Sequence, residues 1–264
     1  MKISIITINY NNLNGLIKTI QSVLSQTNND FEYIIIDGGS TDGSKEFLQE
    51  NSSSFDFWVS EPDNGIYDAM NKGINQAKGE YLLFLNSGDI FSGSHVLMTF
   101  VNSNPIEDIL YGRTFFSIDD QIVSEKTYPS TLTGMELFEY TINHQSTFYS
   151  SKVFKSHEYD SSYSMLADWV LMLDLIFKEQ ISYRRLDFNI CIYDLTGYSS
   201  RPENSQIMNQ ERTRYLELNS NIFIPHLISN YFELLNKYEK VKFTMENTFI
   251  KKLKRKLKRA FHLK

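Results

Sequence analysis

The chain is poor in cysteine and has no long apolar segment, and each absence excludes a class of protein. Its 264 residues include one cysteine, Cys191, so neither an internal disulfide nor a cysteine-based zinc site is possible. No run reaches the roughly 18 to 20 apolar residues that a transmembrane helix requires. The N-terminal MKISIITINYNN lacks the small-residue cleavage site of a signal peptide. We therefore expect a cytoplasmic protein with Cys191 as a small core residue.

Acidic residues are absent from the last 14 positions. Residues 251–264 contain eight Lys or Arg, so residues 1–250 carry 18 basic and 32 acidic side chains, a net charge of −14. Ile250, Leu253, Leu257 and Phe261 recur at intervals of three and four, which is typical of an amphipathic helix. A basic helix of this kind favours an anionic membrane surface. A solvated tail and a nucleic-acid patch are the alternatives, but the acidic body would repel a phosphate backbone, so we expect no nucleic-acid partner.

Three short apolar runs in the first 90 residues predict buried strands, at 3–8, 31–36 and 81–85. Helical patterns lie between and after them, at about 13–25, 44–50 and 66–77. This alternation indicates an α/β fold with parallel strands and right-handed crossovers. It predicts that the carboxyl ends of the strands share one edge of the sheet, where open α/β sheets bind ligands.

Polar residues follow each of these strands. Asn9 and Tyr10 follow the first strand, Asp37 begins DGGSTDG after the second, and Asn86-Ser-Gly-Asp89 follows the third. Such residues are also the commonest turn formers, so a single tetrad is typical of a surface turn. Because polar residues follow all three predicted strands, the pattern favours a functional site over three unrelated surface turns.

Five motifs, in order, resemble the large family 2 of glycosyltransferases over about residues 2–200. They are SIITINYNN, IIIDGGSTDGS, EPDNGIYDAMNKGINQAKGEYLLFLNSGD, HQSTFY and the Ala-Asp-Trp of SMLADWVLML. The resemblance implies a GT-A (Rossmann-like) fold with a mostly parallel central sheet flanked by helices. It also implies a nucleotide-sugar half at about 1–90, an acceptor half at about 91–200, and a role in assembling bacterial surface polysaccharides.

The resemblance places the nucleotide at the ends of the first strands. It implies that Thr7, Asn9 and Tyr10 line the base pocket and that Asp37 accepts from a uracil-like imide N–H, which favours UDP. A carboxylate there would discriminate between bases, because the wrong edge leaves its acceptor unpaired. Thr7 could instead be an ordinary strand residue, and Asp37 a turn or helix-capping residue.

The segment after Asp63 is predicted to form a loop that enters a helix. The functional interpretation places Asp63 near the nucleotide and Asn71 and Lys72 near the diphosphate or sugar. The alternative for Lys72 is a salt bridge with Asp68, four residues earlier on the same helix face.

Asp89 matches the last acid of the family's metal-binding motif. A divalent cation, Mn²⁺ or Mg²⁺, would stabilise a departing nucleoside diphosphate, and such cations prefer oxygen ligands. The positions that often hold further acids are Asn86 and Gly88 here, so Asp89 is the motif's only carboxylate. The resemblance implies that the protein uses a metal ion. Because the motif has a single carboxylate, the affinity for that ion is left open.

Asp168 is the predicted catalytic base. An inverting sugar transfer needs a carboxylate that removes the proton of the attacking hydroxyl, and the family's base occurs at this place. Asp168 lies near the start of an apolar helical run that extends to about Phe177, next to Trp169. A simple first-turn acid that interacts with the helix dipole is the alternative.

Supporting residues are predicted around the donor and acceptor. The resemblance places His144 and Gln145 in that pocket together with Asn86, Ser87 and Trp169, although a buried core histidine is an alternative for His144. The segment LTGYSSRP resembles a mobile loop that closes over the donor, with Gly197 as the hinge and Ser199 or Arg201 as phosphate contacts. A plain connecting loop is the other interpretation.

Residues 201–249 are predicted to form a helical extension, with helices at about 203–218 and 222–238, before the basic tail at 250–264. We expect an inverting glycosyltransferase that moves a sugar, a hexosyl or N-acetylhexosaminyl group, from a UDP-sugar to a glycan or lipid-linked hydroxyl, on the inner face of the cell membrane. A catalytically silent, membrane-associated scaffold is one rival, which the intact Asp168 disfavours. A nucleotidyltransferase would need a Gly-rich phosphate loop after the first strand, and INYNNLNG has none.

Overall fold

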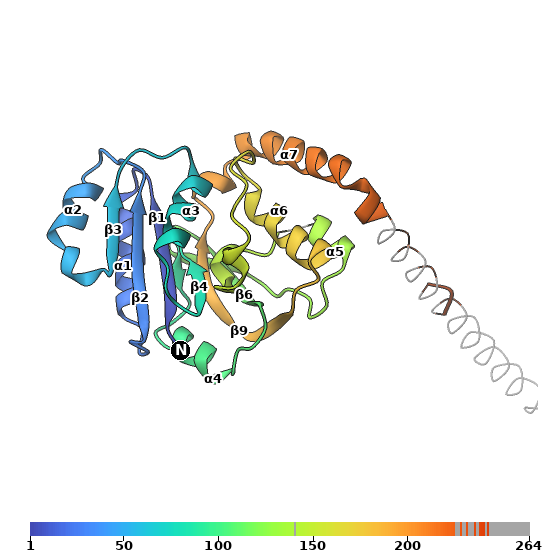
Figure 1. Ribbon diagram of the computed structural model, residues 1–264, viewed down its shortest axis with the longest axis horizontal. Coiled ribbons are helices and arrows are strands. Elements are labelled where there is room, and N and C mark those ends of the chain that lie inside the picture. Colours follow the sequence, from blue (N-terminus) through green and yellow to red (C-terminus); the bar gives the residue numbers. More distant parts are fainter. Residues whose placement is uncertain are drawn as a thin grey trace, which may run out of the picture.

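The structure is a computed structural model that describes residues 1–139 and 141–224, together with 228, 231, 235, 238–240 and 242. These residues form one mixed sheet flanked by helices, with strand order β3-β2-β1-β4-β8-β6-β9-β5 and with β7 paired to β6 (Figure 1). The strands are β1 (Ile3–Asn9), β2 (Phe31–Asp37), β3 (Phe57–Ser60), β4 (Tyr81–Phe84), β5 (Ile90–Phe91), β6 (Ile109–Ile118), β7 (Gln121–Lys126), β8 (Thr147–Ser150) and β9 (Tyr183–Asp194). The helices are α1 (Leu13–Leu24), α2 (Ser44–Glu50), α3 (Ile66–Gln76), α4 (Val96–Asn102), α5 (Gly134–Glu139), α6 (Ala167–Leu173) and α7 (Ser205–Leu218).

The first four strands run parallel, as the alternating pattern predicts. β1 pairs with β2 and with β4, and β2 pairs with β3. The register aligns Asn9 with Asp37 and Asp37 with Ser60. Three polar side chains therefore lie in one row where these strands end, which is the edge at which open α/β sheets bind ligands.

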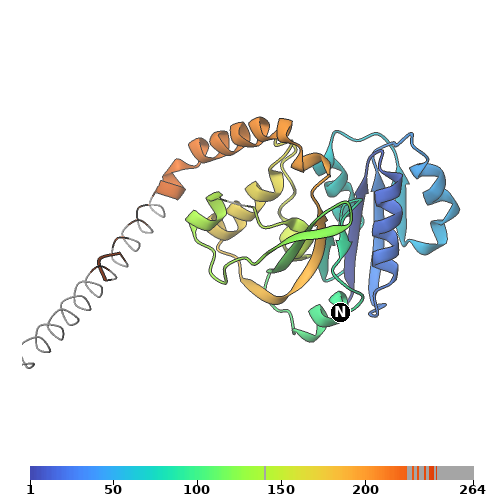
Figure 2. The same ribbon diagram turned by 180° about the vertical axis from the view of Figure 1, so that it is seen from behind.

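The apolar runs are continuous because this half of the sheet is covered on both faces. Ile3 and Ile5 of β1 pack in one core with residues of α1, whereas Ile6 and Ile8 pack in a second core with residues of α3. The two helices accordingly lie on opposite faces of the sheet, α3 in front in Figure 1 and α1 in front in Figure 2. Successive side chains of a strand point to opposite faces, so each core takes alternate residues.

The other half of the sheet mixes strand directions. β8 runs antiparallel to β4 and β6, β7 is antiparallel to β6, and β5 is antiparallel to β9, while β9 is parallel to β6. The mostly parallel character predicted for the sheet thus applies to its first half. Asp119 and Asp120 connect β6 to β7 with φ of 49° and 64°. Two consecutive positive φ values are typical of a tight hairpin turn.

The second core surrounds α6, whose seven residues are all buried. A π-helical turn, Asp174–Lys178, continues α6, so helical structure extends through the predicted run to Phe177. α7 crosses beside α6 (Figure 1). It covers most of the helix predicted at 203–218, and the basic tail at 250–264 lies outside the described residues. Within the described part of the chain, no helix is long and apolar enough to cross a membrane.

Candidate active site

Asp37 is fully buried at the end of β2 and accepts four hydrogen bonds. Its Oδ1 accepts from Asn9 Nδ2 at 2.7 Å and from Ser40 Oγ at 2.5 Å. Its Oδ2 accepts from Ser40 N at 3.0 Å and from Ser60 Oγ at 2.6 Å. Four bonds use the acceptor sites of a carboxylate, so in this arrangement Asp37 holds the ends of β1, β2 and β3 together. Its predicted contact with a base stays a prediction.

Tyr10 and Asp63 lie at the open side of this cluster. Tyr10 is 67% exposed, so its ring is available for stacking. A Cβ on Gly38 would lie 2.4 Å from Asp63 Oδ2 and 3.2 Å from Tyr10 Cδ2. Gly38 therefore makes room for both side chains. Burial raises the pKa of Asp63, and the charges of Asp68 and Asp37 add to the rise.

Three residues predicted to line the nucleotide site make contacts within the protein, and their role in binding stays a prediction. Thr7 is fully buried, with its Oγ1 3.0 Å from the Tyr33 hydroxyl. The Asn71 amide pairs with both backbone groups of Tyr159, at 2.8 and 2.9 Å. Lys72 forms ion pairs with Glu61 at 3.0 Å and Asp68 at 3.6 Å, which includes the i,i+4 bridge considered above.

Asp89 is 5% exposed and accepts from two sides. Its Oδ2 accepts from Gln145 Nε2 at 2.8 Å, and its Oδ1 accepts from the backbone N–H of Asp194 at 2.9 Å. Burial raises the pKa of Asp89 to about 7, against the lowering effect of these two hydrogen bonds. The Asp194 carboxylate lies close by, since its Oδ2 would be 3.6 Å from a Cβ on Gly88. The Asp194 charge also raises the pKa of Asp89, so the end of β9 places a second carboxylate near the turn that carries Asp89.

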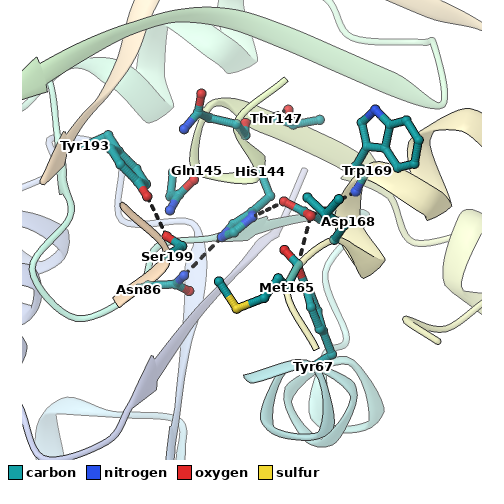
Figure 3. A network of polar contacts seen from close by, with 12 residues as sticks. Tyr67, Asn86, His144, Gln145, Thr147, Met165, Asp168, Trp169, Tyr193 and Ser199 are labelled. Atoms are coloured by element: carbon teal, nitrogen blue, oxygen red, sulfur yellow. Dashed lines mark hydrogen bonds and ion pairs between the residues drawn. The ribbon is translucent and has the colours of Figure 1, made fainter. Parts of the chain in front are cut away.

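Asp168 is the centre of a second buried network, which Figure 3 shows. Its Oδ2 lies 2.9 Å from His144 Nδ1, and its Oδ1 accepts from the Tyr67 hydroxyl and from Trp169 N, each at 2.9 Å. His144 Nε2 lies 3.0 Å from Asn86 Nδ2. The chain of contacts thus extends from α3 through α6 to the turn after β4.

Burial strongly raises the pKa of the Tyr67 hydroxyl, and the Asp168 charge adds to the rise. The hydroxyl therefore keeps its proton at any working pH and remains a donor. It lies 2.9 Å from the Met165 carbonyl oxygen as well as from Asp168. Tyr67 thereby ties α3 to the start of α6.

The adjacent residues His144 and Gln145 connect the two acidic centres. His144 contacts Asp168, and Gln145 donates to Asp89. Both lie in a 3₁₀ turn, His144–Ser146, directly before β8, which pairs with β4. Five predicted site residues are thus brought into one continuous network: Asn86, Asp89, His144, Gln145 and Asp168.

The family of the chain follows from its sequence. A model of "Glycosyl transferase family 2" matches residues 4–153. This chain is a family 2 glycosyltransferase. An uncharacterized glycosyltransferase of Mycobacterium tuberculosis strain H37Rv is 35% identical over 221 residues, which cover 80% of this chain and 81% of that one. A "PGL/p-HBAD biosynthesis glycosyltransferase" of Mycobacterium bovis strain BCG is 31% identical over 160 residues, 57% of this chain and 60% of its own length.

Solved structures agree with this fold. The transferase aligns with S. aureus TarS 1-349 in complex with UDP at a TM-score of 0.62 and 18% identity, over 84% of this chain and 74% of that one. It also aligns with the mannosyltransferase PcManGT from Pyrobaculum calidifontis, in complex with GDP-Man and Mn²⁺. The TM-score is 0.53 and the identity 12%, over 72% of this chain and 56% of that one. These likenesses confirm the GT-A fold that the motifs implied.

The side chains of the other predicted residues of the transferase make contacts separate from Asp89 and Asp168. The Trp169 ring is fully buried and its indole N–H donates to the Leu137 carbonyl, so it packs in the core beside Asp168. Ser199 Oγ lies 2.7 Å from the Tyr193 hydroxyl, and the Arg201 guanidinium lies over the Tyr198 ring. Gly197 N donates to the Asp194 carbonyl oxygen at 3.3 Å, so the predicted loop begins next to Asp89 and Asp194.

Three residues important to this arrangement were not predicted from the sequence of the transferase. Tyr67 donates to Asp168, Asp194 N donates to Asp89, and Glu211 accepts from Met165 N just before α6; each contact joins residues at least 46 positions apart. Tyr67 and Asp194 lie within or beside motifs, but nothing local distinguishes them from core or turn residues. Glu211 lies in a polar helix without a motif.

Proposed function

We propose that this glycosyltransferase moves a sugar from a UDP-sugar to a hydroxyl group with inversion at the anomeric carbon. The observation that carries the proposal is the His144–Gln145 pair, which holds two buried carboxylates, Asp168 and Asp89, in one network. An inverting transfer needs two such centres, one that stabilises the leaving diphosphate and one that takes the acceptor's proton.

The donor side has polar groups with unused bonding capacity. Among the described residues, four buried oxygens near the strand ends have no hydrogen-bond partner: Asn9 Oδ1, Asn86 Oδ1, Ser87 Oγ and Gln145 Oε1. A buried acceptor without a partner costs free energy, so a bound molecule with several hydroxyl groups would satisfy them. Tyr10 would stack on the base, with Asp63 beside it. The UDP complex of the structural neighbour TarS supports UDP as the nucleotide.

The acids at the turn fit a hard divalent cation. Asp89 and Asp194 offer two carboxylates, and no group of three or more His, Cys, Asp or Glu side chains gathers into a metal site in the described part of the chain. Mg²⁺ and Mn²⁺ accept few protein ligands when phosphates and waters supply the rest. Bound there, the cation would supply charge stabilisation for the leaving diphosphate. The Mn²⁺ complex of PcManGT supports this proposal.

Asp168 would act as the general base. Asp168 is 9% exposed, and its carboxylate is held by three donors from α3, α6 and the turn before β8. Among the described residues, only His144 donates to Oδ2, which keeps capacity for one more bond. The acceptor hydroxyl would donate to Asp168, transfer its proton there as its oxygen attacks the anomeric carbon, and release the nucleoside diphosphate from the opposite face.

We also propose that the acceptor is a glycan or lipid-linked sugar of a bacterial surface polysaccharide. The naming of one relative for PGL/p-HBAD biosynthesis supports a role in glycan assembly. Work at a lipid-linked acceptor would place the enzyme on the inner membrane face, with residues 250–264 as the anchor. Full-length protein should sediment with anionic vesicles and a chain ending at residue 249 should not, while neutral vesicles control for charge. Equal sedimentation of the two chains would contradict the anchor.

The proposed reaction is tested by ¹H NMR with a panel of UDP-hexoses and UDP-N-acetylhexosamines in Mn²⁺. Water replaces the unknown acceptor, so a slow release of free sugar is expected for one donor. Inversion predicts that an α-linked donor first yields the β-anomer. Asp168→Asn should lower this rate by a factor of about 10² to 10⁴. Failure to consume any donor, or an α-anomer as first product, would contradict the proposal.

A further inference from the structure

We propose that His144 is a positioning residue for Asp168, and that its Nδ1–H, not its contact with Asn86, carries this role. The inference rests on the proposed function, because it assigns His144 to the same transfer reaction. It begins from the two nitrogen atoms of one buried ring, which contact different elements (Figure 3).

The partner on each side decides where the ring proton lies. An ionised Asp168 only accepts, so the nitrogen 2.9 Å from its Oδ2 must be the N–H that donates. In the neutral ring Nε2 then has no hydrogen, and it accepts from Asn86 Nδ2 at 3.0 Å. Turning the Asn86 amide would bring its unpartnered Oδ1 to Nε2, which suits a doubly protonated ring. Both arrangements keep the same Nδ1–H on Asp168.

The His144 donor fixes the orientation of the Asp168 carboxylate. Oδ1 is held by the Tyr67 hydroxyl and by Trp169 N, each at 2.9 Å. His144 is the only protein donor that the described residues place on Oδ2. Without it this oxygen could rotate away from an incoming hydroxyl. Since reacting atoms must be aligned for transfer, loss of one orienting contact slows the chemical step more than it weakens donor binding.

The ring itself is held in place. His144 is 8% exposed, and its ring packs perpendicular to the Phe84 ring at a centroid distance of 6.5 Å. Its neighbour Gln145 is held by Asp89, so the 3₁₀ turn is anchored on both sides. A histidine that served only as packing would not need hydrogen bonds from both nitrogens.

Two substitutions of His144 distinguish the role of Nδ1 from that of Nε2. In His144→Asn the amide nitrogen can take the place of Nδ1, because it lies the same number of bonds from Cα. In His144→Gln the amide can take the place of Nε2, which keeps the Asn86 contact and loses the one to Asp168. Both variants lose the ring packing on Phe84, so each controls for the other.

The kinetic test uses the UDP-sugar that the wild type consumes fastest. His144→Gln should lower kcat about 10- to 100-fold with the donor KM changed less than about twofold, and His144→Asn should retain at least about ten times more activity than His144→Gln. Equal kcat values for the two variants, or a loss confined to KM, would overturn the inference while leaving the proposed function intact. A wild type that consumes no donor overturns both.

A spectroscopic test needs no turnover. In protein carrying ¹⁵N-labelled histidine, His144 should show the Nδ1–H tautomer, with a signal that shifts in Asp168→Asn. Asp174→Asn is the matched control, because Asp174 is also an acid of this helical segment but bonds Tyr215 and Lys178. An Nε2–H tautomer, or a His144 signal that does not shift in Asp168→Asn, would overturn the inference.

Discussion

At the scale of single residues, the donor edge depends on the absence of a side chain at Gly38. A Cβ there would lie 2.4 Å from Asp63 Oδ2, closer than non-bonded atoms approach. Gly38→Ala should therefore displace the Asp63 carboxylate and the Tyr10 ring, and weaken UDP binding about tenfold in isothermal titration. Gly93→Ala is the control, because nothing lies within 4 Å of its added Cβ. An unchanged affinity of Gly38→Ala for UDP would mean that the nucleotide base binds elsewhere.

Asp89 should make the stability of the metal-free protein depend on pH. Burial raises its pKa from 3.8 to about 7, so the folded state holds a proton that the unfolded chain releases at lower pH. This contribution to stability is present below pH 3.8 and is lost as the pH rises through about 7, amounting in full to about 4 kcal/mol. Metal binding, which favours the ionised form, would offset the loss.

Asp89→Asn removes this titration. The variant keeps an acceptor for Asp194 N, and Gln145 can turn its unpartnered Oε1 toward the new amide. In urea unfolding with EDTA, the stability of Asp89→Asn relative to the wild type should increase by about 2 to 3 kcal/mol between pH 5 and pH 8. A difference that stays constant across this range would mean that Asp89 is ionised throughout.

At the scale of elements, α7 positions the start of α6. Glu211 accepts from Ser164 N and Met165 N at 2.6 and 3.1 Å, and also from Ser164 Oγ and Leu166 N. The residue at the N-cap of α6, Leu166, makes no side-chain cap. The backbone N–H of Leu166 and those of the two residues before it have no partners within α6, so a side chain from a distant helix fixes the segment that leads into α6.

Glu211→Gln should lower the free energy of unfolding by about 2 to 4 kcal/mol, because its amide nitrogen would face backbone N–H donors. Asp168, two residues after Leu166, should lose alignment and kcat should fall as well. Glu217→Gln, at an exposed position of the same helix, provides the comparison in denaturant unfolding. Equal stability of the two variants would show that the Glu211 hydrogen bonds contribute nothing measurable.

The elements of the first half could be predicted because their signals are local. Apolar runs, polar turns and helical periodicity place β1, β2, β4 and the helices between them to within one or two residues. The predicted pattern omitted β3, whose four residues are all half-buried. The directions of β6, β8 and β9 depend on pairings between distant segments, for which the sequence offers no short-range signal.

The same contrast applies to the candidate site. The family's motifs identify Asp89, Asp168 and the His144–Gln145 pair, and the structure brings these residues together. The partners that set their state come from elsewhere: Tyr67 acts across 101 positions and Asp194 across 105. A sequence identifies groups with chemical capacity, whereas their burial and hydrogen bonds depend on the tertiary fold.

At the scale of the whole molecule, charge is separated along the chain. Residues 1–250 carry a net charge of −14, and residues 251–264 carry eight basic side chains and no acid. The acids Asp63, Asp89 and Asp194 gather near the strand ends, where a dianionic donor would be repelled unless a cation neutralised them. Nucleotide binding at this acidic edge of the sheet should therefore depend on metal.

The most direct test of the account is isothermal titration of the full chain with UDP, GDP and dTDP, each with Mn²⁺ and with EDTA. We expect UDP alone to bind, only with Mn²⁺, and this binding to disappear in Asp89→Ala while Asp168→Asn retains it. Binding of UDP that is equally strong in EDTA would contradict the metal-assisted donor site, and binding of no nucleotide would contradict the proposed transfer.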